Sequence, residues 1–294
     1  MRVFVTGASG HIGSAVVPEL IQAGHEVVGL ARSDASAAAV KAMGAEVRRG
    51  DLDDLDDLRE AAADADAVIH LAFNHDAISA GNFAGAVATD LAVVQALGDA
   101  LAGTGKGLIG IGLTHTGDAK RDAVIDANPR SAVARAIAGF TERGVRTVLV
   151  AIPPVTHSTR DKIGFIPTLI TIARDTGVSG YVGDGANRWP AGHVLDIGHL
   201  YRLALVKAPA GSQLYAAAEE GITVREIAET IGRHLNVPAV SIPAEQAADH
   251  FKAFPFMTLD ITMSNADTRQ LLDWEPVHPG LIADLEDGHY FTTD

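Results

Sequence analysis

Residues 2–13 read RVFVTGASGHIG, and this stretch decides the fold. Its first part, Arg2–Thr6, is a short apolar run rich in β-branched residues, which is typical of a buried strand. Three glycines follow at once, Gly7, Gly10 and Gly13, and the residues after them have the spacing of a helix. A strand that passes into a helix through closely spaced glycines predicts the first unit of a parallel sheet covered by helices.

The glycine spacing also indicates a phosphate-binding turn. Gly7 permits the tight turn, Gly10 lets the backbone approach a pyrophosphate, and Gly13 lets the helix pack closely on the strand. The free N–H groups at the start of the helix then face the phosphates. We therefore expect a bound dinucleotide, and the turn residues predicted to contact it are Gly7, Ser9, Gly10, His11, Ile12 and Gly13.

The alternation of strand and helix continues to residue 152, which predicts an α/β fold with a doubly wound parallel sheet of the Rossmann type over residues 1–152. The predicted strands are residues 2–6, 26–30, 46–48, 67–71, 107–113 and 146–152, and the predicted helices are 11–24, 35–43, 55–63, 82–101 and 129–143.

The pattern changes at Pro153 and Pro154, where a glycine-rich stretch begins. We predict that residues 153–294 form mostly a smaller substrate-binding lobe and that residues 195–217 return to the first domain. Within this part the predicted helices are 165–175, 195–206, 223–235 and 244–252, and the predicted strands are 213–217 and 239–242.

Charge and composition exclude several classes of function. The chain has 294 residues with 23 Lys and Arg against 37 Asp and Glu, a formal net charge of −14, which disfavours nucleic acid and anionic membranes as partners. It has no cysteine, so disulfides, thiolate metal ligands and a cysteine nucleophile are excluded. Twelve histidines form no His-Glu-x-x-His run, and we expect no metal site. With no signal peptide and no apolar run of membrane-spanning length recognised, we expect a soluble cytoplasmic protein.

The residues that follow the second predicted strand select the cofactor. At the place where a carboxylate would bind the ribose 2′-hydroxyl of NAD, the sequence has Ala31 followed by Arg32 and Ser33. A guanidinium beside a hydroxyl favours the 2′-phosphate of NADP. The sequence therefore predicts NADP(H) in preference to NAD, and we expect the following Asp34 to cap the next helix.

These and later motifs resemble the extended and atypical short-chain dehydrogenases/reductases, the NAD(P)-dependent epimerase/dehydratase-like superfamily. Asp51-Leu52 is similar to the pair that flanks the adenine, residues 68–72 (VIHLA) to the fourth strand, and residues 152–155 (IPPV) to the loop at the nicotinamide end. Residues 183–185 (GDG) and 193–197 (HVLDI) resemble the substrate-lobe stretch and the return to the main domain. The resemblance implies a nicotinamide dinucleotide and reductase, epimerase or dehydratase chemistry. Its further implied cofactor contacts are Asp51, Leu52, Leu71, Ala72, Phe73, Pro153 and Val155.

The chain departs from that superfamily at the helix before the sixth strand, where members carry Tyr-x-x-x-Lys. The corresponding positions here are Asp126 and Arg130, which resemble an atypical subgroup with His-x-x-x-Arg, although Asp replaces the His. Arg130 would bind the nicotinamide ribose or an anionic substrate, because its own pKa is too high for it to supply a proton. All four tyrosines lie beyond the sixth predicted strand: Tyr181, Tyr201, Tyr215 and Tyr290.

Other polar residues are candidates for contacts with the substrate. Thr114 and Thr116 match the position after the fifth strand where the family has a Ser or Thr that binds the substrate oxygen. The proton would come from His157, from a protonated Asp126 or from ordered water, and the sequence does not choose among them. Trp189, in a glycine-rich stretch, is harder to explain as a core residue than as part of a substrate wall. The residues predicted to line the pocket are Asn74, His75, Arg188, Trp189 and His193.

Together these features predict an NADP(H)-dependent oxidoreductase that transfers hydride to a small carbonyl or related unsaturated substrate. Two alternatives stay open. One is a non-catalytic NADP-binding sensor or scaffold that has lost the proton relay, and the other is an epimerase or dehydratase that recycles NAD(P). The expected partner is a small-molecule substrate, and the helices predicted at 82–101 and 129–143 either pair in a homodimer or pack internally.

Overall fold

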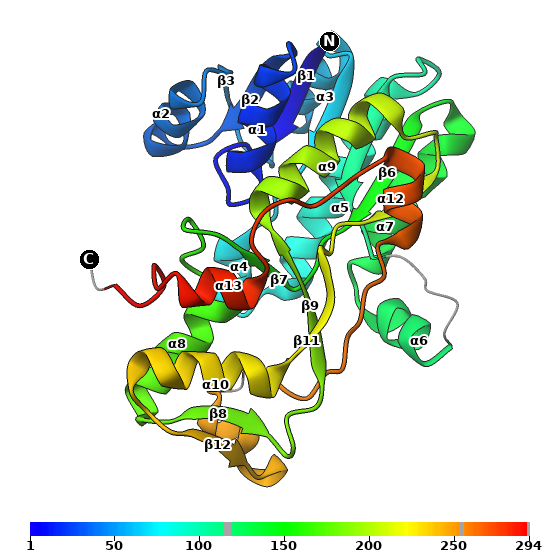
Figure 1. Cartoon of the computed structure of the whole chain (residues 1–294). Helices are drawn as coiled ribbons and strands as arrows, with labels where there is room; N and C mark the ends of the chain where they lie inside the picture. Colours follow the sequence, from blue (N-terminus) through cyan, green and yellow to red (C-terminus); the bar gives the residue numbers. More distant parts are fainter. Residues whose placement is uncertain (114–118, 253, 255, 293–294) are drawn as a thin grey trace. The chain divides into compact units, whose positions relative to one another are not determined.

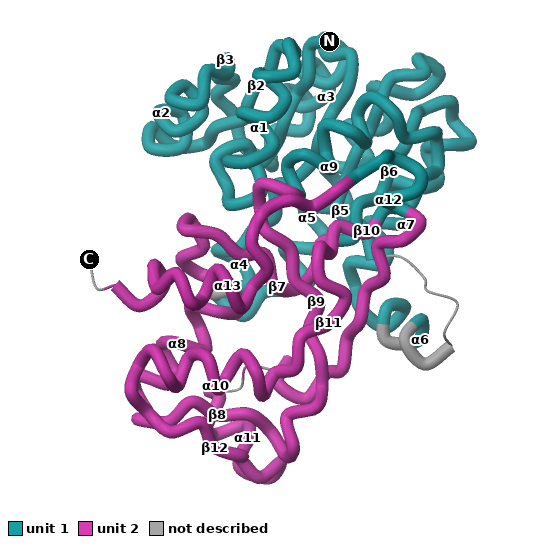
Figure 2. Tube along the Cα trace, viewed as in Figure 1, with its two compact units in different colours: residues 1–151, 197–214, 268–274 teal, residues 152–196, 215–267, 275–294 magenta. Residues whose placement is uncertain are grey.

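The computed structural model of the chain describes residues 1–113, 119–252, 254 and 256–292 (Figure 1). The chain forms two compact units, shown in different colours in Figure 2. Unit 1 comprises residues 1–151, 197–214 and 268–274, and unit 2 comprises residues 152–196, 215–267 and 275–294.

Unit 1 is built on a seven-stranded sheet with the order β10-β6-β5-β4-β1-β2-β3. The pairings among β1 to β6 are parallel, so their carboxyl ends lie at one edge of the sheet. This is the Rossmann fold that the sequence predicts. The strands are β1 (Arg2–Thr6), β2 (Glu26–Ala31), β3 (Glu46–Arg49), β4 (Ala67–His70), β5 (Gly107–Ile111), β6 (Arg146–Ala151) and β10 (Ser212–Tyr215).

Helices cover the sheet of unit 1 on both faces, which explains why its central strands are apolar without alternation. All four residues of β4 are buried. The helices and the 3₁₀ helix η1 are α1 (Gly13–Gln22), α2 (Asp34–Ala42), α3 (Leu55–Asp64), α4 (His75–Ser79), α5 (Phe83–Leu101), α6 (Ala119–Ala127), α7 (Ser131–Gly139), η1 (Phe140–Arg143), α9 (Val194–Lys207) and α12 (Ala266–Leu272).

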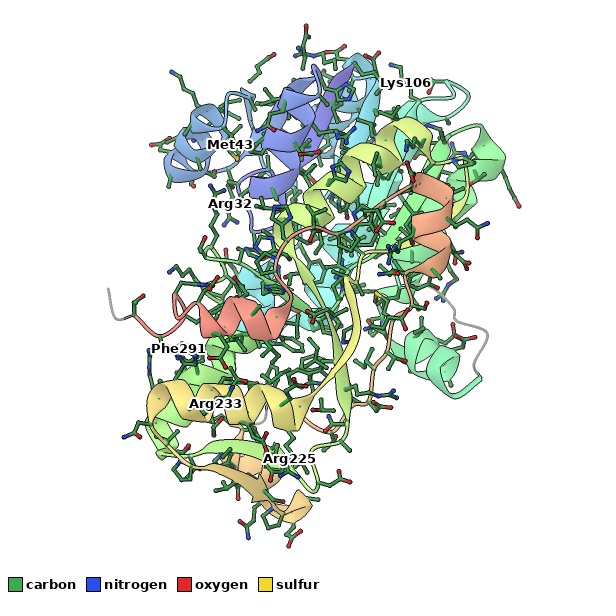
Figure 3. All side chains as sticks on the ribbon, viewed as in Figure 1. Arg32, Met43, Lys106, Arg225, Arg233 and Phe291 are labelled. Atoms are coloured by element: carbon green, nitrogen blue, oxygen red, sulfur yellow. The ribbon has the colours of Figure 1, made fainter. Side chains whose placement is uncertain are left out.

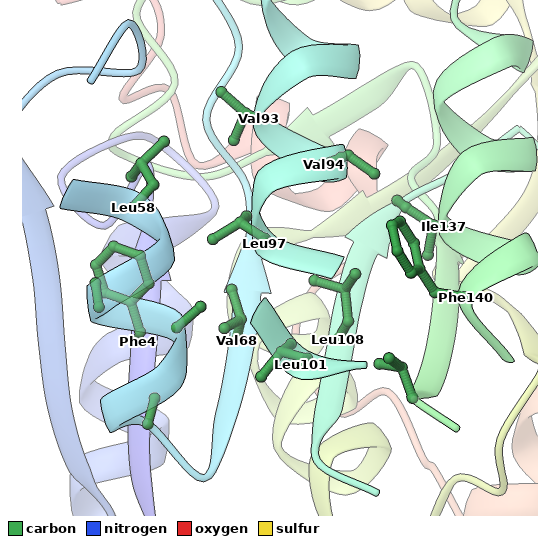
Figure 4. Close-up of a cluster of buried hydrophobic side chains, with 14 of the residues drawn as sticks. Phe4, Leu58, Val68, Val93, Val94, Leu97, Leu101, Leu108, Ile137 and Phe140 are labelled. Atoms are coloured by element: carbon green, nitrogen blue, oxygen red, sulfur yellow. The ribbon is translucent and has the colours of Figure 1, made fainter. Parts of the chain in front are cut away.

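The main core of unit 1 lies between the sheet and helices α3, α5 and α7 (Figure 4). Leu97 and Leu101 on α5 pack in the same buried cluster as Phe4 of β1 and Leu108 of β5. Helix α9 approaches α1 closely elsewhere in unit 1, because a Cβ on Gly198 would lie 2.9 Å from the backbone of Ala15. The small side chain of Gly198 therefore permits this helix contact.

Helix α5 corrects one sequence-based expectation. It has 19 residues, and by length and composition it is the one helix among the described residues that could cross a membrane. Half of that apolar stretch is buried inside the protein. The expectation that no apolar run reaches this length is therefore wrong, and the physical reason is that α5 is a long core helix of unit 1.

Unit 2 contains two small sheets. In the first, β9 pairs antiparallel with β11 and parallel with β7, and in the second, β8 and β12 are parallel. Trp189 and Phe251 are fully buried at the core of this unit. Its elements are β7 (Val155–His157), β8 (Ser179–Val182), β9 (Arg188–His193), β11 (Glu219–Thr223), β12 (Ala239–Ile242), α8 (Phe165–Thr176), α10 (Val224–Leu235), η2 (Ala244–Gln246), α11 (Ala247–His250) and α13 (Leu281–Glu286).

The predicted elements differ from the structure mainly at helix ends and in unit 2. The helix predicted at 129–143 is α7 followed by η1, and the helix predicted at 244–252 is η2 followed by α11. Ser33, not Asp34, caps α2: its hydroxyl accepts a hydrogen bond from the backbone N–H of Ser36 in a reciprocal capping box. The elements that the sequence did not predict are α4, α6, β7, β8, β9, β11, α12 and α13.

Leu97→Ala tests the packing of α5. Leu97 is completely buried, so truncation leaves a cavity and we expect a loss of about 2–5 kcal/mol in the free energy of unfolding. The matched control is Leu271→Ala on α12, also in unit 1, because Leu271 is largely exposed and its truncation changes the free energy by about 0.5 kcal/mol or less. Urea unfolding followed by far-UV circular dichroism measures both, and equal small losses would contradict the packing described here.

Candidate functional site

The turn between β1 and α1 has room only for glycine at two positions. Gly7 has a φ of +68°, and a Cβ on it would lie 2.7 Å from the backbone nitrogen of Ala72. A Cβ on Gly13 would lie 2.2 Å from the carbonyl oxygen of Gly7. The backbone N–H of Gly10 donates to that same oxygen over 3.0 Å and closes the turn. The loop therefore presents bare backbone at the carboxyl edge of the sheet.

The start of α1 fits an anionic ligand. No side chain caps this helix, whereas side chains cap α2, α3, α4 and α5 at Ser33, Asp54, Asn74 and Asn82. The N–H groups of Ser14 and Ala15 donate to the carbonyl oxygens of Gly10 and Ile12. The positive end of the helix dipole at this turn still favours an anion such as a phosphate. The predicted turn residues Ser9, His11 and Ile12 lie in this segment, which precedes or enters α1.

Arg32 follows β2 at the same edge and lies between two carboxylates. Its Nη2 donates to Asp76 Oδ2 over 2.9 Å, and its Nε lies 3.8 Å from Asp51 Oδ2. The hydrogen bond to Asp76 and the negative charge of Asp51 raise the pKa of the guanidinium. The side chain, labelled in Figure 3, is 65% exposed, so it remains accessible to a ligand. Two residues predicted to contact the cofactor, Arg32 and Asp51, thus lie together, while the third, Leu52, packs against the core of unit 1.

A chain of buried polar groups runs from β1 to α5. The backbone N–H of Ala72 donates to Thr6 Oγ1 over 3.3 Å, and Thr6 Oγ1 lies 2.6 Å from His70 Nδ1. On the other side of the ring, His70 Nε2 lies 2.8 Å from Asp90 Oδ1. Since a carboxylate only accepts, His70 donates from Nε2 to Asp90, and its Nδ1 shares a hydrogen bond with the Thr6 hydroxyl. Each polar group in this chain therefore has a partner.

The last member of that chain is Arg130, at the N-cap position of α7. Its Nη2 lies 3.4 Å from Asp90 Oδ2, and its guanidinium carbon lies 4.1 Å from the centre of the Phe73 ring. His75 meets the same ring edge to face, with the two ring centres 5.7 Å apart. Burial first, and then the charge of Arg130, lower the pKa of His75. The structure thus brings together Phe73, His75 and Arg130, which the sequence analysis assigned to three different roles.

The remaining predicted residues of unit 1 either lie apart from the group formed by Phe73, His75 and Arg130 or fall outside the described residues. Asp126 is on α6, half exposed, with Oδ1 3.9 Å from Arg135 Nη1. The Asn74 side chain caps α4 by accepting from the N–H of Ala77. Leu71 and Ala72 line the turn, because a Cβ on Gly7 would touch their backbone. Thr114 and Thr116 lie outside the described residues.

In unit 2 the residues of interest are histidines and aspartates. His157, completely buried at the end of β7, donates from Nδ1 to Asp284 Oδ2 over 2.8 Å. Its other ring nitrogen, Nε2, is buried without a hydrogen-bond partner in the described part of the chain. The His193 ring meets His157 edge to face and stacks on His278, with ring centres 5.3 Å and 4.8 Å apart. The hydrogen bond to Asp284 places a proton on Nδ1 and orients the ring, with Nε2 facing the interior of unit 2.

Two other predicted substrate contacts of unit 2 have structural partners. Arg188 donates from Nε and Nη2 to the two carboxylate oxygens of Asp260, at 3.0 Å and 2.9 Å. Trp189 lies on β9 in the core of unit 2 and packs edge to face on Phe165. The ring is completely buried, so the expectation that it forms a substrate wall rather than core is wrong. Pro153 and Val155 are also buried within unit 2.

The sequence reasoning did not select Thr6, His70, Asp90 or Asp284 for the site. Asp90 carries a usable signal, because it is a carboxylate in the middle of a mostly apolar helix. Asp284 carries none, since its partner His157 is 127 positions away. Tyr201 in unit 1 is fully buried, and burial raises the pKa of its hydroxyl, so it does not replace the missing tyrosine as an acid. Across the described residues, no group of three or more His, Asp or Glu side chains is arranged to hold a metal ion.

Comparison with known proteins gives the family. The sequence model described as "NAD dependent epimerase/dehydratase family" matches residues 3–123. An uncharacterized protein of Schizosaccharomyces pombe is 41% identical over 299 residues, covering 99% of this chain and all of that protein. A quinoline-oxide ketoreductase of Stigmatella aurantiaca is 39% identical over 72 residues, 24% of this chain and 22% of that enzyme.

Solved structures agree on the fold. UDP-glucuronic acid 4-epimerase from Bacillus cereus, in complex with UDP-glucuronic acid and NAD, has a TM-score of 0.72 at 17% identity, and 98% of each chain is covered. The glycine turn and the strand order define a protein of the Rossmann-type dinucleotide-binding class. Within that class, the chain belongs to the NAD-dependent epimerase/dehydratase family.

His193 makes the stability of unit 2 depend on pH. Burial first, and then the charge of His157, lower the pKa of His193 to about 4. The unfolded chain binds a proton near the ordinary His value of about 6.5, so the stabilisation is complete above that pH and is lost as the pH falls towards 4. Between pH 7 and pH 4, we expect the free energy of unfolding of His193→Gln to fall by up to about 3 kcal/mol less than that of the wild-type chain.

The measurement is urea unfolding at several pH values, followed through the fluorescence of Trp189 in a Trp274→Phe background. Trp189 lies in unit 2 and Trp274 in unit 1, so this background reports on unit 2 alone. The two chains compared differ only at residue 193, so the contributions of the other titrating groups cancel in the difference between their free energies of unfolding. A difference in the free energy of unfolding that stays constant with pH would refute the assignment.

Proposed function

We propose that the protein is an NADP(H)-dependent oxidoreductase that transfers hydride to a small carbonyl or related unsaturated substrate. The observation that carries this proposal is the turn after β1, where Gly7 and Gly13 have no space for a side chain and α1 begins without a side-chain cap. Such a turn supports the binding of a dinucleotide pyrophosphate. The partial identity to a ketoreductase supports reduction of a carbonyl group.

The preference for NADP rests on Arg32. A carboxylate at the end of β2 would favour NAD, and this chain has Ala31 and Arg32 there instead. The guanidinium is exposed and already bonded to the side chain of Asp76, so a 2′-phosphate would compete with that carboxylate for its donors. The Ser33 hydroxyl accepts from the N–H of Ser36 and donates to the Ser36 hydroxyl over 3.1 Å, so a 2′-phosphate would compete with Ser36 for its proton.

The other residues take the following roles in this proposal. Backbone at Gly7, Gly10 and Gly13 would hold the pyrophosphate, and Asp51 and Leu52 would flank the adenine. Leu71, Ala72, Phe73, Pro153 and Val155 would lie along the nicotinamide half, and Thr114 or Thr116 would orient the substrate oxygen. When bound, NADPH supplies a hydride, and the proton would come from His157, whose Asp284 partner fixes its tautomer. We also propose a cytoplasmic protein, with no nucleic acid or membrane as partner.

The proposal is tested by NADPH consumption over a broad panel of aldehydes, ketones and activated alkenes with purified protein. We expect oxidation of NADPH, seen as loss of absorbance at its reduced nicotinamide band, with at least one member of the panel. Tight NADPH binding without turnover of any member would instead favour a sensor or scaffold, the alternative that the missing Tyr–Lys pair supports.

Arg32→Ala tests the choice of cofactor. Because a charged hydrogen bond contributes about 1.5–3 kcal/mol, we expect the Kd of NADPH to rise about 10- to 100-fold while that of NADH changes less than about twofold. Asp76→Asn frees the guanidinium and should tighten NADPH binding. Arg59→Ala is the control, since Arg59 is an exposed arginine of α3 paired with Asp56. Equal weakening of both dinucleotides by Arg32→Ala, measured by fluorescence titration, would remove the preference.

A second candidate is an epimerase or dehydratase that retains and recycles NAD(P). The family assignment favours it, and so does the fold shared with the B. cereus epimerase. Such an enzyme returns the hydride to its product, so it consumes no NADPH overall. Cofactor that co-purifies with the protein, together with product formation and no net change in NADPH, would favour this candidate over the reductase.

A further inference from the structure

The guanidinium of Arg130 contacts an aromatic ring and a carboxylate, and most of its N–H donors have no partner among the described residues. Its guanidinium carbon lies 4.1 Å from the centre of the Phe73 ring, and its Nη2 lies 3.4 Å from Asp90 Oδ2. A guanidinium has five N–H donors, and within the described residues this is its one side-chain hydrogen bond. The side chain is 25% exposed, so part of the planar donor edge is available to a ligand.

The position of this cation is fixed by groups that are themselves buried. Asp90, 2% exposed, is bound by His70 Nε2 at 2.8 Å, and His70 is bound by Thr6 Oγ1 at 2.6 Å. Reorienting Asp90 would break the hydrogen bond from His70 inside the core, which costs more than leaving an exposed pair. Asp90 is therefore a rigid support for Arg130. Arg135, also on α7, instead pairs with the exposed Asp126.

The location of Arg130 separates it from the cofactor-selecting arginine. Arg32 and Asp51 follow β2 and β3 at one end of the strand order, and Phe73 follows β4 on the other side of β1. In a doubly wound sheet the pyrophosphate binds after β1, so the two halves of a dinucleotide extend to either side of that strand. Arg130 thus belongs to the half opposite the 2′-phosphate, where the substrate would bind.

The charge near Arg130 suits a single anionic group. The adjacent His75 adds no positive charge near neutrality, because burial and Arg130 itself lower the pKa of the ring. One planar guanidinium matches the two oxygens of a carboxylate, whereas a phosphate dianion usually gathers more than one cation. Because Asp90 balances the charge of Arg130, an anion would be recognised by the remaining N–H donors of the guanidinium rather than by a net positive charge.

We propose that Arg130, supported by Asp90 and stacked on Phe73, is a carboxylate-binding site, and that the substrate carries a carboxylate. The substrate class rests on the proposed oxidoreductase function, whereas the binding site itself does not. In this arrangement Arg130 contacts the substrate, and Asp90 is a positioning residue that acts through Arg130. No covalent step is assigned to either residue.

The test compares 2-oxo acids, from pyruvate to longer aliphatic members, with their methyl esters as neutral matches. Binding of each is measured by isothermal titration calorimetry, without and with saturating NADPH. We expect the wild-type chain to bind the best acid at least about 10-fold more tightly than its ester. Arg130→Gln should abolish this preference, because it removes the positive charge and the paired N–H donors of the guanidinium. Arg130→Lys keeps the charge and should restore the preference in part. Arg135→Gln, on the same helix, should leave it unchanged.

The role of Asp90 is tested by a double-mutant cycle. Asp90→Asn should weaken binding of the acid less than Arg130→Gln does, and the double variant should bind no more weakly than Arg130→Gln alone, since Asp90 acts only through Arg130. Additive losses would refute the positioning role. Circular dichroism of each variant checks folding, and Arg130→Gln, at a partly exposed site, keeps the test valid if Asp90→Asn does not fold.

Different measurements decide the carboxylate site at Arg130 and the oxidoreductase function. Equal binding of acids and esters, or no binding of either, overturns the carboxylate site even if NADPH binds and is consumed with other substrates. Arg130→Gln that loses NADPH affinity while keeping the preference for acids also overturns it, because Arg130 would then serve the dinucleotide. Absence of NADPH binding refutes the oxidoreductase, and titration of the acids without NADPH still decides whether Arg130 binds a carboxylate.

Discussion

The close approach of Gly7 and Gly13 to neighbouring backbone is the constraint on which the rest of unit 1 depends. A Cβ on either residue would lie less than 3 Å from backbone atoms, so strand β1, the end of β4 and helix α1 meet only if both positions lack side chains. The backbone there is close to the surface and α1 begins uncapped. The two glycines that permit this packing also leave the turn without side chains at those positions, at the carboxyl edge of the sheet.

Around that turn, the two arginines of the site are held in different ways. Arg32 is exposed between two exposed carboxylates, an arrangement that is screened by salt and exchanges partners at little cost. Arg130 is held by a buried carboxylate that is itself hydrogen-bonded inside the core. The exposed pairing of Arg32 suits a contact that forms only when a ligand binds. The buried support of Arg130 suits a side chain whose position does not change on binding.

The sequence predicted the sheet of unit 1 well because its signals are local. Apolar strands, the glycine turn and the helix spacing are each contained in short segments, and β1 has the bounds that were predicted. Strand β12 of unit 2 was predicted, whereas β7, β8, β9 and β11 were missed. The missed strands are short or contain Pro and Gly, as in RWPAGH of β9 and EEGIT of β11, so they lack a local strand pattern. The site residues, such as Arg130, were selected from local motifs, whereas the partners that hold them are distant in sequence and were not predicted. Asp90 is 40 positions and Asp284 127 positions from the residue each one binds.

The missing Tyr–Lys pair changes the chemistry that unit 1 offers more than it changes the fold. A lysine at the position of Arg130 would be a point charge able to act on a neighbouring tyrosine, whereas a guanidinium stays protonated and recognises flat, two-oxygen groups. Burial raises the pKa of Tyr201, so that residue does not restore acid–base function within unit 1. The described residues near Arg130 therefore favour recognition over proton transfer, with His70 and Asp90 committed to one another and to support. Within unit 2, the hydrogen bond to Asp284 orients the ring of His157.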